Sequence, residues 1–234
     1  MQSYSCKEIL ARILWYIYPM PAEERPRSWR DLAQGNAVRV DTAIMQSLAH
    51  PLRLRLLGLL RTLGPSTATK LAARVHESSG LTSYHLRQLA SAGLVAEAEP
   101  ADLVGVQQTG GRERWWKAAH RATITADLPG EDDEVGLAAI EDYTRAIVAT
   151  QSANAQSWLA EAHRWPREWL DAALYSDVIL RLTVDEMRGL ATELMEVVSR
   201  YRGNDPSKEP EPGMVIVAAQ FHVFPSADQE PPAG

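Results

Sequence analysis

The fold is decided by residues 66–95, which read STATKLAARVHESSGLTSYHLRQLASAGLV. The hydroxylated residues Ser66–Thr69 are typical of a helix start, and the apolar spacing that follows predicts a short helix through Val75. A turn over residues 77–80 leads to a second helix over 81–92, where Gly93 supplies the left-handed residue that ends it. Two short helices joined by a tight turn predict a helix-turn-helix.

The helix over 81–92 has two chemically different faces. Its inward positions hold small or apolar residues, namely Thr82, Leu86, Leu89 and Ala90. Its outward positions hold hydroxyl, amide and guanidinium groups, namely Ser83, Tyr84, Arg87, Gln88 and Ser91. Such groups hydrogen-bond to phosphates and base edges, and the major groove is wide enough for one helix. This helix is therefore predicted to read DNA.

Two further helices are expected before this motif. Residues 39–50 follow a helical pattern that His50-Pro51 interrupts, and Pro51 suits the first turn of the next helix. That next helix carries leucines over most of its circumference, Leu56 among them, and Gly64-Pro65 closes it. We expect it to lie in the core.

A β-hairpin is expected after the motif. Residues 94–98 and 112–117 read as strands, and the loop between them ends in Gly110-Gly111. Arg112 and Arg114 alternate onto one face of the second strand, where they would lie beside the phosphate backbone or the minor groove. The pattern thus predicts a wing.

The remainder of the chain is expected to be a helical dimerisation or effector region. A long helix begins at the acidic turn of residues 131–134 and continues past Trp158, with a loose apolar stripe suited to a helix interface. Residues 176–183 and 214–224 read as strands that pair in a small antiparallel sheet, and 184–201 read as an amphipathic helix between them. The fold class is α+β, mostly helical.

The distribution of charge also separates the helix-turn-helix part of the 234-residue chain from its C-terminal region. The whole chain has a net charge of −6, but residues 43–120 hold 9 Lys/Arg against 5 Asp/Glu, and residues 121–234 hold 9 against 20. A mildly basic middle followed by an acidic remainder favours a DNA-facing part attached to one that faces away from DNA. We predict an N-terminal extension over 1–36, a winged helix-turn-helix domain over 37–125 and the C-terminal region over 126–234.

Residues 40–120 resemble the ArsR-like winged-helix transcription regulators of bacteria. The resemblance rests on Leu48–Arg53, on residues 66–95 and on Gly110–Trp116. It implies a homodimer that binds inverted repeats in double-stranded DNA, often as a repressor released by a signal. Metal-sensing members carry a cysteine pair in the helix before the recognition helix, where this chain has Ala68, Ala72 and Ala73, so soft-metal sensing there is not expected.

The expected DNA-contacting residues come from the second helix, its start and the wing. They are Ser78, Ser79, Thr82, Ser83, Tyr84, His85, Arg87, Gln88, Arg112 and Arg114. The alternative is a winged-helix protein-interaction module that does not bind DNA, since the same fold also serves as a docking surface. A docking face would favour apolar residues where this chain has polar and cationic ones.

Other classes of function find little support in the sequence. The six histidines lack a metal-ligand spacing, the glycines match no phosphate loop, and no nucleophile and base form a recognisable set, so neither a metal, a cofactor nor an enzymatic activity is expected. Trp158, Trp165 and Trp169 favour a packed cluster over a ligand pocket, and an effector is left open. One cysteine, Cys6, and the lack of a membrane-spanning run favour a cytoplasmic protein.

Overall fold

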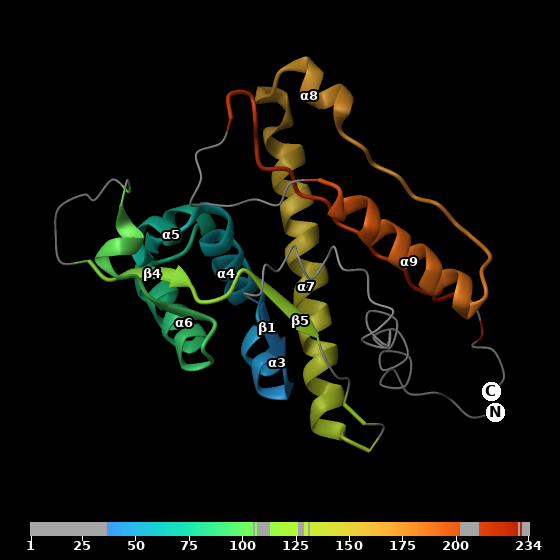
Figure 1. Cartoon of the computed structure of the whole chain (residues 1–234), viewed down its shortest axis with the longest axis horizontal. Helices are drawn as coiled ribbons and strands as arrows, with labels where there is room; N and C mark the ends of the chain where they lie inside the picture. The colour runs from blue at the N-terminus through green and yellow to red at the C-terminus, as the bar shows by residue number, and fades with distance from the viewer. Residues whose placement is uncertain are drawn as a thin grey trace.

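The computed structural model describes residues 37–104, 106, 113–125, 129–130, 132–201, 211–228 and 230, and shows a mostly helical α+β chain (Figure 1). This confirms the predicted fold class. The predicted N-terminal extension over 1–36 lies outside the described residues, as do Gly110-Gly111 and Arg112 of the wing.

Two helices precede the helix-turn-helix, as expected, but the first is shorter than predicted. Helix α3 spans Thr42–Leu48 because residues Ala37–Val40 form strand β1 and Asp41 caps the helix through its carboxylate, which accepts from the Ile44 N–H at 2.8 Å. Helix α4 spans Pro51–Leu63, starts at the predicted proline and buries Leu56, Leu57 and Leu60. It is the predicted core helix.

The helix-turn-helix itself consists of α5, Ala68–Val75, and α6, Ser79–Ser91. Both pack on α4, and their inward leucines complete the core. Leu71, Leu86 and Leu89 are almost wholly shielded from solvent. The inward face that the sequence pattern predicts for these two helices is therefore confirmed.

The predicted wing pairing is present in the described residues. Strand β3, Val95–Glu97, pairs antiparallel with β4, Trp115–Ala118, and the short 3-10 helix η1, Pro100–Leu103, lies in the loop between them. A two-residue strand β2, Ser66–Thr67, adds to the other edge of β4. The sheet thereby ties the wing to the start of α5.

Strand β1 pairs in parallel with β5, Ala122–Thr125, although neither was predicted as a strand. The two segments are four residues long and lie far apart in the sequence, so no local alternation or turn signals their pairing. Their ladder joins the segment before α3 to the segment after the wing.

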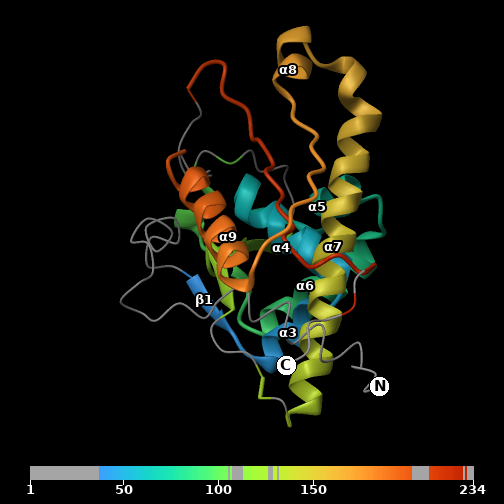
Figure 2. The same cartoon turned by 90° about the vertical axis from the view of Figure 1, so that its right-hand side faces the viewer.

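The long helix α7, Glu134–Glu161, confirms the predicted helix of the acidic region. Its first half packs on α3 and α4 and contributes Ala139, Ile140 and Tyr143 to the core of the helix-turn-helix part. Its second half extends away toward the 3-10 helix η2, Ala162–Arg164, and α8, Arg167–Ala172 (Figures 1 and 2).

The C-terminal part differs from prediction in one respect. Helix α9, Val184–Ser199, lies where a helix was expected, with a capping box formed by Thr183 and Glu186. The strands predicted at 176–183 and 214–224 are wrong for this chain alone, because neither segment forms a ladder in the described residues. A strand requires a hydrogen-bonded partner, and an apolar alternation does not say where that partner lies.

The glycine after α6 allows a first test of the fold. Gly93 adopts φ +71°, so Gly93→Ala should lower the free energy of unfolding by about 1–2 kcal/mol, the cost of a left-handed β-carbon. Gly58→Ala, within α4 and with open space around an added β-carbon, should instead stabilise by up to about 1 kcal/mol. Urea unfolding measures both changes, and equal effects of the two substitutions would contradict this assignment of the turn.

Candidate nucleic-acid interface

Side-chain caps fix both helices of the motif. Thr67 Oγ1 accepts from the Lys70 N–H at 3.3 Å to start α5, and Ser78 Oγ accepts from the Leu81 N–H at 3.2 Å to start α6. Between them His76 adopts a left-handed conformation with φ 59°, which turns the chain sharply. Ser78 is thus the N-cap residue of α6.

Helix α6 presents a continuous polar row to solvent. Tyr84 is 49% exposed, Ser83 is half-buried, and the remaining members are exposed, namely Ser78, Ser79, Arg87 and Gln88. Ser91 Oγ donates to the Arg87 backbone carbonyl at 2.8 Å, and the Arg87 residue itself is exposed. The structure therefore brings most of the expected α6 residues together on one surface.

Two expected site residues lie in the interior instead. Thr82 is 0% exposed and His85 only 5% exposed, so neither side chain can reach DNA from this fold. Their positions follow the helical repeat that also buries Leu86 and Leu89. In the described residues neither Thr82 Oγ1 nor His85 Nδ1 has a hydrogen-bond partner. Both side chains therefore lie beneath the exposed row.

A small group of aromatic and cationic side chains supports α6 from below. The His50 and His85 rings have centroids 4.5 Å apart, and Tyr84 contacts His85 edge-on at 5.2 Å. His50 also caps α4, because its Nδ1 accepts from the Leu52 N–H at 3.1 Å. Burial lowers the pKa of His85, and the adjacent His50 and Arg53 lower it further, while Glu77 opposes them. The folded protein therefore favours a neutral His85.

Acidification should destabilise the protein through this group. Because the pKa of His85 is lowered on folding, the unfolded chain binds more protons below about pH 6.5, and stability is lost as pH falls toward the lowered folded value. Urea unfolding from about pH 8 to pH 5 should show this loss, and His85→Gln should reduce its slope. The exposed His163→Gln variant serves as the control. An unchanged slope in the His85 variant would refute the assignment.

The wing carries cations close to acidic residues. Arg114 Nε lies 3.3 Å from Glu97 Oε2, and its guanidinium lies over the Trp116 ring at 5.5 Å. Lys117 Nζ lies 2.7 Å from Asp102, and this hydrogen bond lowers the pKa of that carboxyl. Arg114 is exposed and pre-oriented by both contacts, so it is available at the wing surface.

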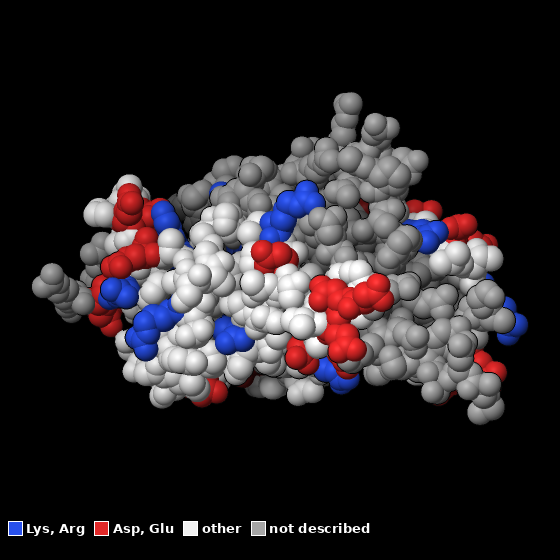
Figure 3. Space-filling model, turned by 90° about the horizontal axis from the view of Figure 1, so that it is seen from below, with Lys and Arg blue, Asp and Glu red and all other residues white. Residues whose placement is uncertain are grey.

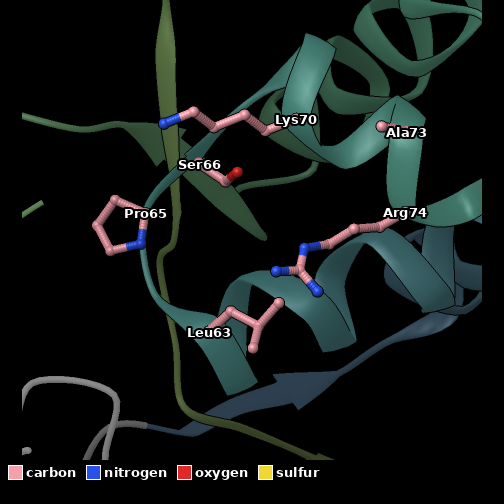
Figure 4. Close-up of a pocket in the computed structure, with 6 residues that line it drawn as sticks. All are labelled: Leu63, Pro65, Ser66, Lys70, Ala73 and Arg74. Atoms are coloured by element: carbon pink, nitrogen blue, oxygen red, sulfur yellow. The ribbon is translucent and has the colours of Figure 1, made fainter. Parts of the chain in front are cut away.

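Sequence reasoning did not identify Lys70 and Arg74 as candidates, although both project from α5. They line an open hollow of about 500 Å³ between α4, β2 and α5, together with Leu63, Pro65, Ser66 and Ala73. Figure 4 shows Arg74 extending toward Leu63 and Lys70 extending past Ser66. Lys70 Nζ lies 4.5 Å from the Trp115 ring centroid, which places a cation between the motif and the wing. Their four-residue spacing, which places both cations on one side of α5, was the available signal.

The surface charge follows the division seen in the sequence. Figure 3 shows Lys and Arg side chains over the underside of the helix-turn-helix and, mixed with acidic groups, at the wing end. A separate acidic patch lies toward the N-terminal end of α7, where Asp133 caps the helix and Glu134 occupies its first turn. On this view the basic side chains of the helix-turn-helix and the acidic patch therefore occupy separate areas.

The sequence also raised the questions of a metal site, a membrane-spanning helix and a tryptophan cluster. Among the described residues no cluster of three histidine, cysteine, aspartate or glutamate side chains could hold a metal ion, and no helix is long and apolar enough to cross a membrane. Trp165 packs edge-on between Trp158 and Trp169, with centroid distances of 5.5 and 5.9 Å. Trp115 and Trp116, on strand β4 of the wing, are buried.

Comparison with known protein families matches residues 48–98 to a family described as a helix-turn-helix domain. The match covers α4, α5, α6 and β3, which are the elements that hold the exposed row of α6. No curated protein matches the chain. The fold, the site and the match define a helix-turn-helix of the class found in DNA-binding regulators.

Proposed function

We propose that this protein is a sequence-specific, homodimeric DNA-binding transcription regulator, a repressor of the ArsR-like type. Helix α6 enters the major groove and the wing lies along the flanking backbone. The observation that carries this proposal is the row of hydroxyl, amide and guanidinium groups on the exposed face of α6, directly above a fully buried leucine face.

The chemistry of that row suits base reading. Arg87 can donate two hydrogen bonds to a guanine edge, and Gln88 can pair with an adenine. Ser78, Ser79 and Ser83 lie at the start of the helix, where hydroxyls and free backbone N–H groups bind phosphates. The proposed contact set is therefore Ser78, Ser79, Ser83, Tyr84, Arg87, Gln88, Arg112 and Arg114, and excludes the buried Thr82 and His85.

Cations outside α6 would hold the helix in register without reading sequence. Arg114 on the wing and Lys70 on α5 lie on either side of the Trp115–Trp116 strand, and both can reach phosphates. Because such contacts release counterions, affinity should fall steeply with salt concentration.

The competing function is a winged-helix docking module that binds protein and not DNA. The exposed part of α6 argues against it, because it offers Arg87, Gln88 and serine hydroxyls where a docking surface would concentrate apolar groups. Tyr84 is the one large aromatic side chain on that row. DNA affinity distinguishes the two functions directly.

Any signal response would have to use a site other than a thiolate pair on α5. Ala68, Ala72 and Ala73 occupy that helix, and Ala72 is buried against the core. A soft metal ion requires thiolate or imidazole ligands, which α5 does not supply. We assign no effector to the acidic region.

Selection from a random library of DNA duplexes tests the proposal. The full chain should enrich one motif, arranged as an inverted repeat whose half-sites lie about 10 base pairs apart or a multiple of this. A variant with Arg87 and Gln88 both changed to alanine should enrich no motif. Failure of the wild-type protein to retain any duplex above background would reject DNA binding and favour the docking module.

A further inference from the structure

The C-terminal region exposes an apolar segment whose backbone has no hydrogen-bond partner among the described residues. Between α8 and α9, Val178 is 65% exposed and Ile179 is 80% exposed, and Leu174, Leu180 and Leu182 are also exposed. Among the described residues, no backbone hydrogen bond is made by 174–182. An extended apolar edge of this kind is a template for pairing with another strand.

The part of the chain that the structure describes forms no ladder with this segment. The run from α8 to α9 and the segment over 211–228 both lie beside α9 and run in the same direction (Figures 1 and 2). No ladder joins them, and residues 215–224 likewise form no backbone hydrogen bond in the described part of the chain. Among the described residues, none therefore pairs with this segment, which leaves a second copy of the chain as a candidate partner.

The order of side chains in the segment is self-complementary. If two copies pair antiparallel about Ile179, Asp177 of each copy lies opposite Arg181 of the other, on the same face of the sheet. On the opposite face Val178 lies across from Leu180, so the apolar side chains of the two copies meet. In the described residues Asp177 and Arg181 have no ion-pair partner within their own chain.

We propose that residues 175–183 pair antiparallel with the same residues of a second copy, centred on Ile179. This deepens the proposed function, because it rests on the homodimer and names the segment that builds it. A two-fold axis through Ile179 makes the contact isologous, so both copies use the same surface. The paired strands would then join the two acidic C-terminal regions and leave both α6 helices free to bind half-sites.

Charge limits where two copies of the acidic region can meet. Residues 121–234 carry 9 Lys/Arg against 20 Asp/Glu, which would repel another copy over most of their surface. Residues 174–183 hold one acid and one base and are neutral. Self-association is therefore favoured at this segment, where the charges also match in the antiparallel register.

Charge reversal at the two positions gives a sharp test. Asp177→Arg and Arg181→Asp should each raise the dimer dissociation constant about tenfold or more, because like charges then face each other twice. Mixing the two single variants should form a heterodimer, and combining both changes in one chain should restore the homodimer. Analytical ultracentrifugation of the full chain measures each. Glu168→Arg, a charge reversal on the nearby exposed helix α8, should leave the dimer unchanged.

Cysteine cross-linking tests the register independently. In a Cys6→Ser background, Ile179→Cys places two thiols directly opposite each other and should form a disulfide dimer on mild oxidation. Val178→Cys places them on a diagonal about 7–8 Å apart and should cross-link far less. Equal cross-linking of the two variants would overturn the register.

Different results would contradict the dimer proposal and the DNA-binding proposal. A monomeric wild-type chain, or a dimer that ignores both single charge reversals, would overturn the pairing. DNA affinity of the same samples tests the proposed function on its own, because a monomer can still bind one half-site. Charge variants that dissociate, retain the wild-type melting temperature and recover when mixed would establish the interface.

Discussion

Leu86→Ala is expected to lower the free energy of unfolding by about 2–5 kcal/mol, as truncation of a buried leucine does. Leu86 is 0% exposed on the inner face of α6, within the cluster that also contains Leu56 and Leu71. Removing its side chain leaves a cavity where α4, α5 and α6 meet. Urea unfolding followed by circular dichroism measures the change.

Leu81→Ala is the matched control, because Leu81 lies on the same helix but is 40% exposed. Its truncation should cost less than about 1.5 kcal/mol, since less apolar surface is removed from contact. A Leu86 variant that unfolds at the wild-type urea concentration would show that the inner face of α6 is misassigned, and the outward row would then lose its structural basis.

Arg87→Ala is expected to weaken binding to the selected DNA site by about 1–3 kcal/mol, which is the range for a guanidinium that reads a base. Stability should change little, because Arg87 is exposed and projects from the helix. Binding to scrambled DNA should fall much less, so specificity as well as affinity would decrease. Competition titrations with the two duplexes give both values.

Arg164→Ala removes one exposed arginine from η2, in the acidic region, and keeps the change in net charge identical. It should leave DNA affinity within experimental error of wild type. If the Arg87→Ala and Arg164→Ala variants both bind the selected site as tightly as the wild-type protein, Arg87 reads no base. If both lose the same affinity, the effect reflects net charge and not the position on α6.

Local patterns were enough to predict the helix-turn-helix. Capping hydroxyls, helical spacing of leucines and a glycine at the end of α6 are signals carried by neighbouring residues. The wing strands could also be predicted, because β3 and β4 are close in sequence and carry Val95 and Trp116, which pack in the core. These features specify structure through short-range contacts, which a sequence displays directly.

Partners far away in sequence were not predicted. The β1–β5 ladder joins two four-residue segments across the whole helix-turn-helix part, and nothing local in either segment specifies the other. Thr82 and His85 were included among the DNA contacts for their chemistry, although the helical repeat places both beneath the surface. Burial outweighs residue type in deciding which side chains can touch a ligand.

The pairing partners of the C-terminal segments could not be predicted from the sequence either. Apolar alternation over 176–183 and 214–224 predicted strands, and the extended chain there has the expected exposure of apolar side chains but no ladder. The alternation of apolar side chains indicates that a segment can form a strand. Its ladder hydrogen bonds depend on a neighbouring strand, which the alternation does not identify. The proposed second copy would supply that missing strand.

Fluorescence anisotropy on labelled duplexes tests the central claim most directly. The full chain is titrated onto DNA from upstream of its own gene, onto the library-selected site and onto scrambled DNA, at several salt concentrations. We predict tight binding to the selected site, weaker binding to scrambled DNA and a steep loss of affinity as salt rises. Equal and negligible binding to all three duplexes at every salt concentration would contradict a DNA-reading function for α6.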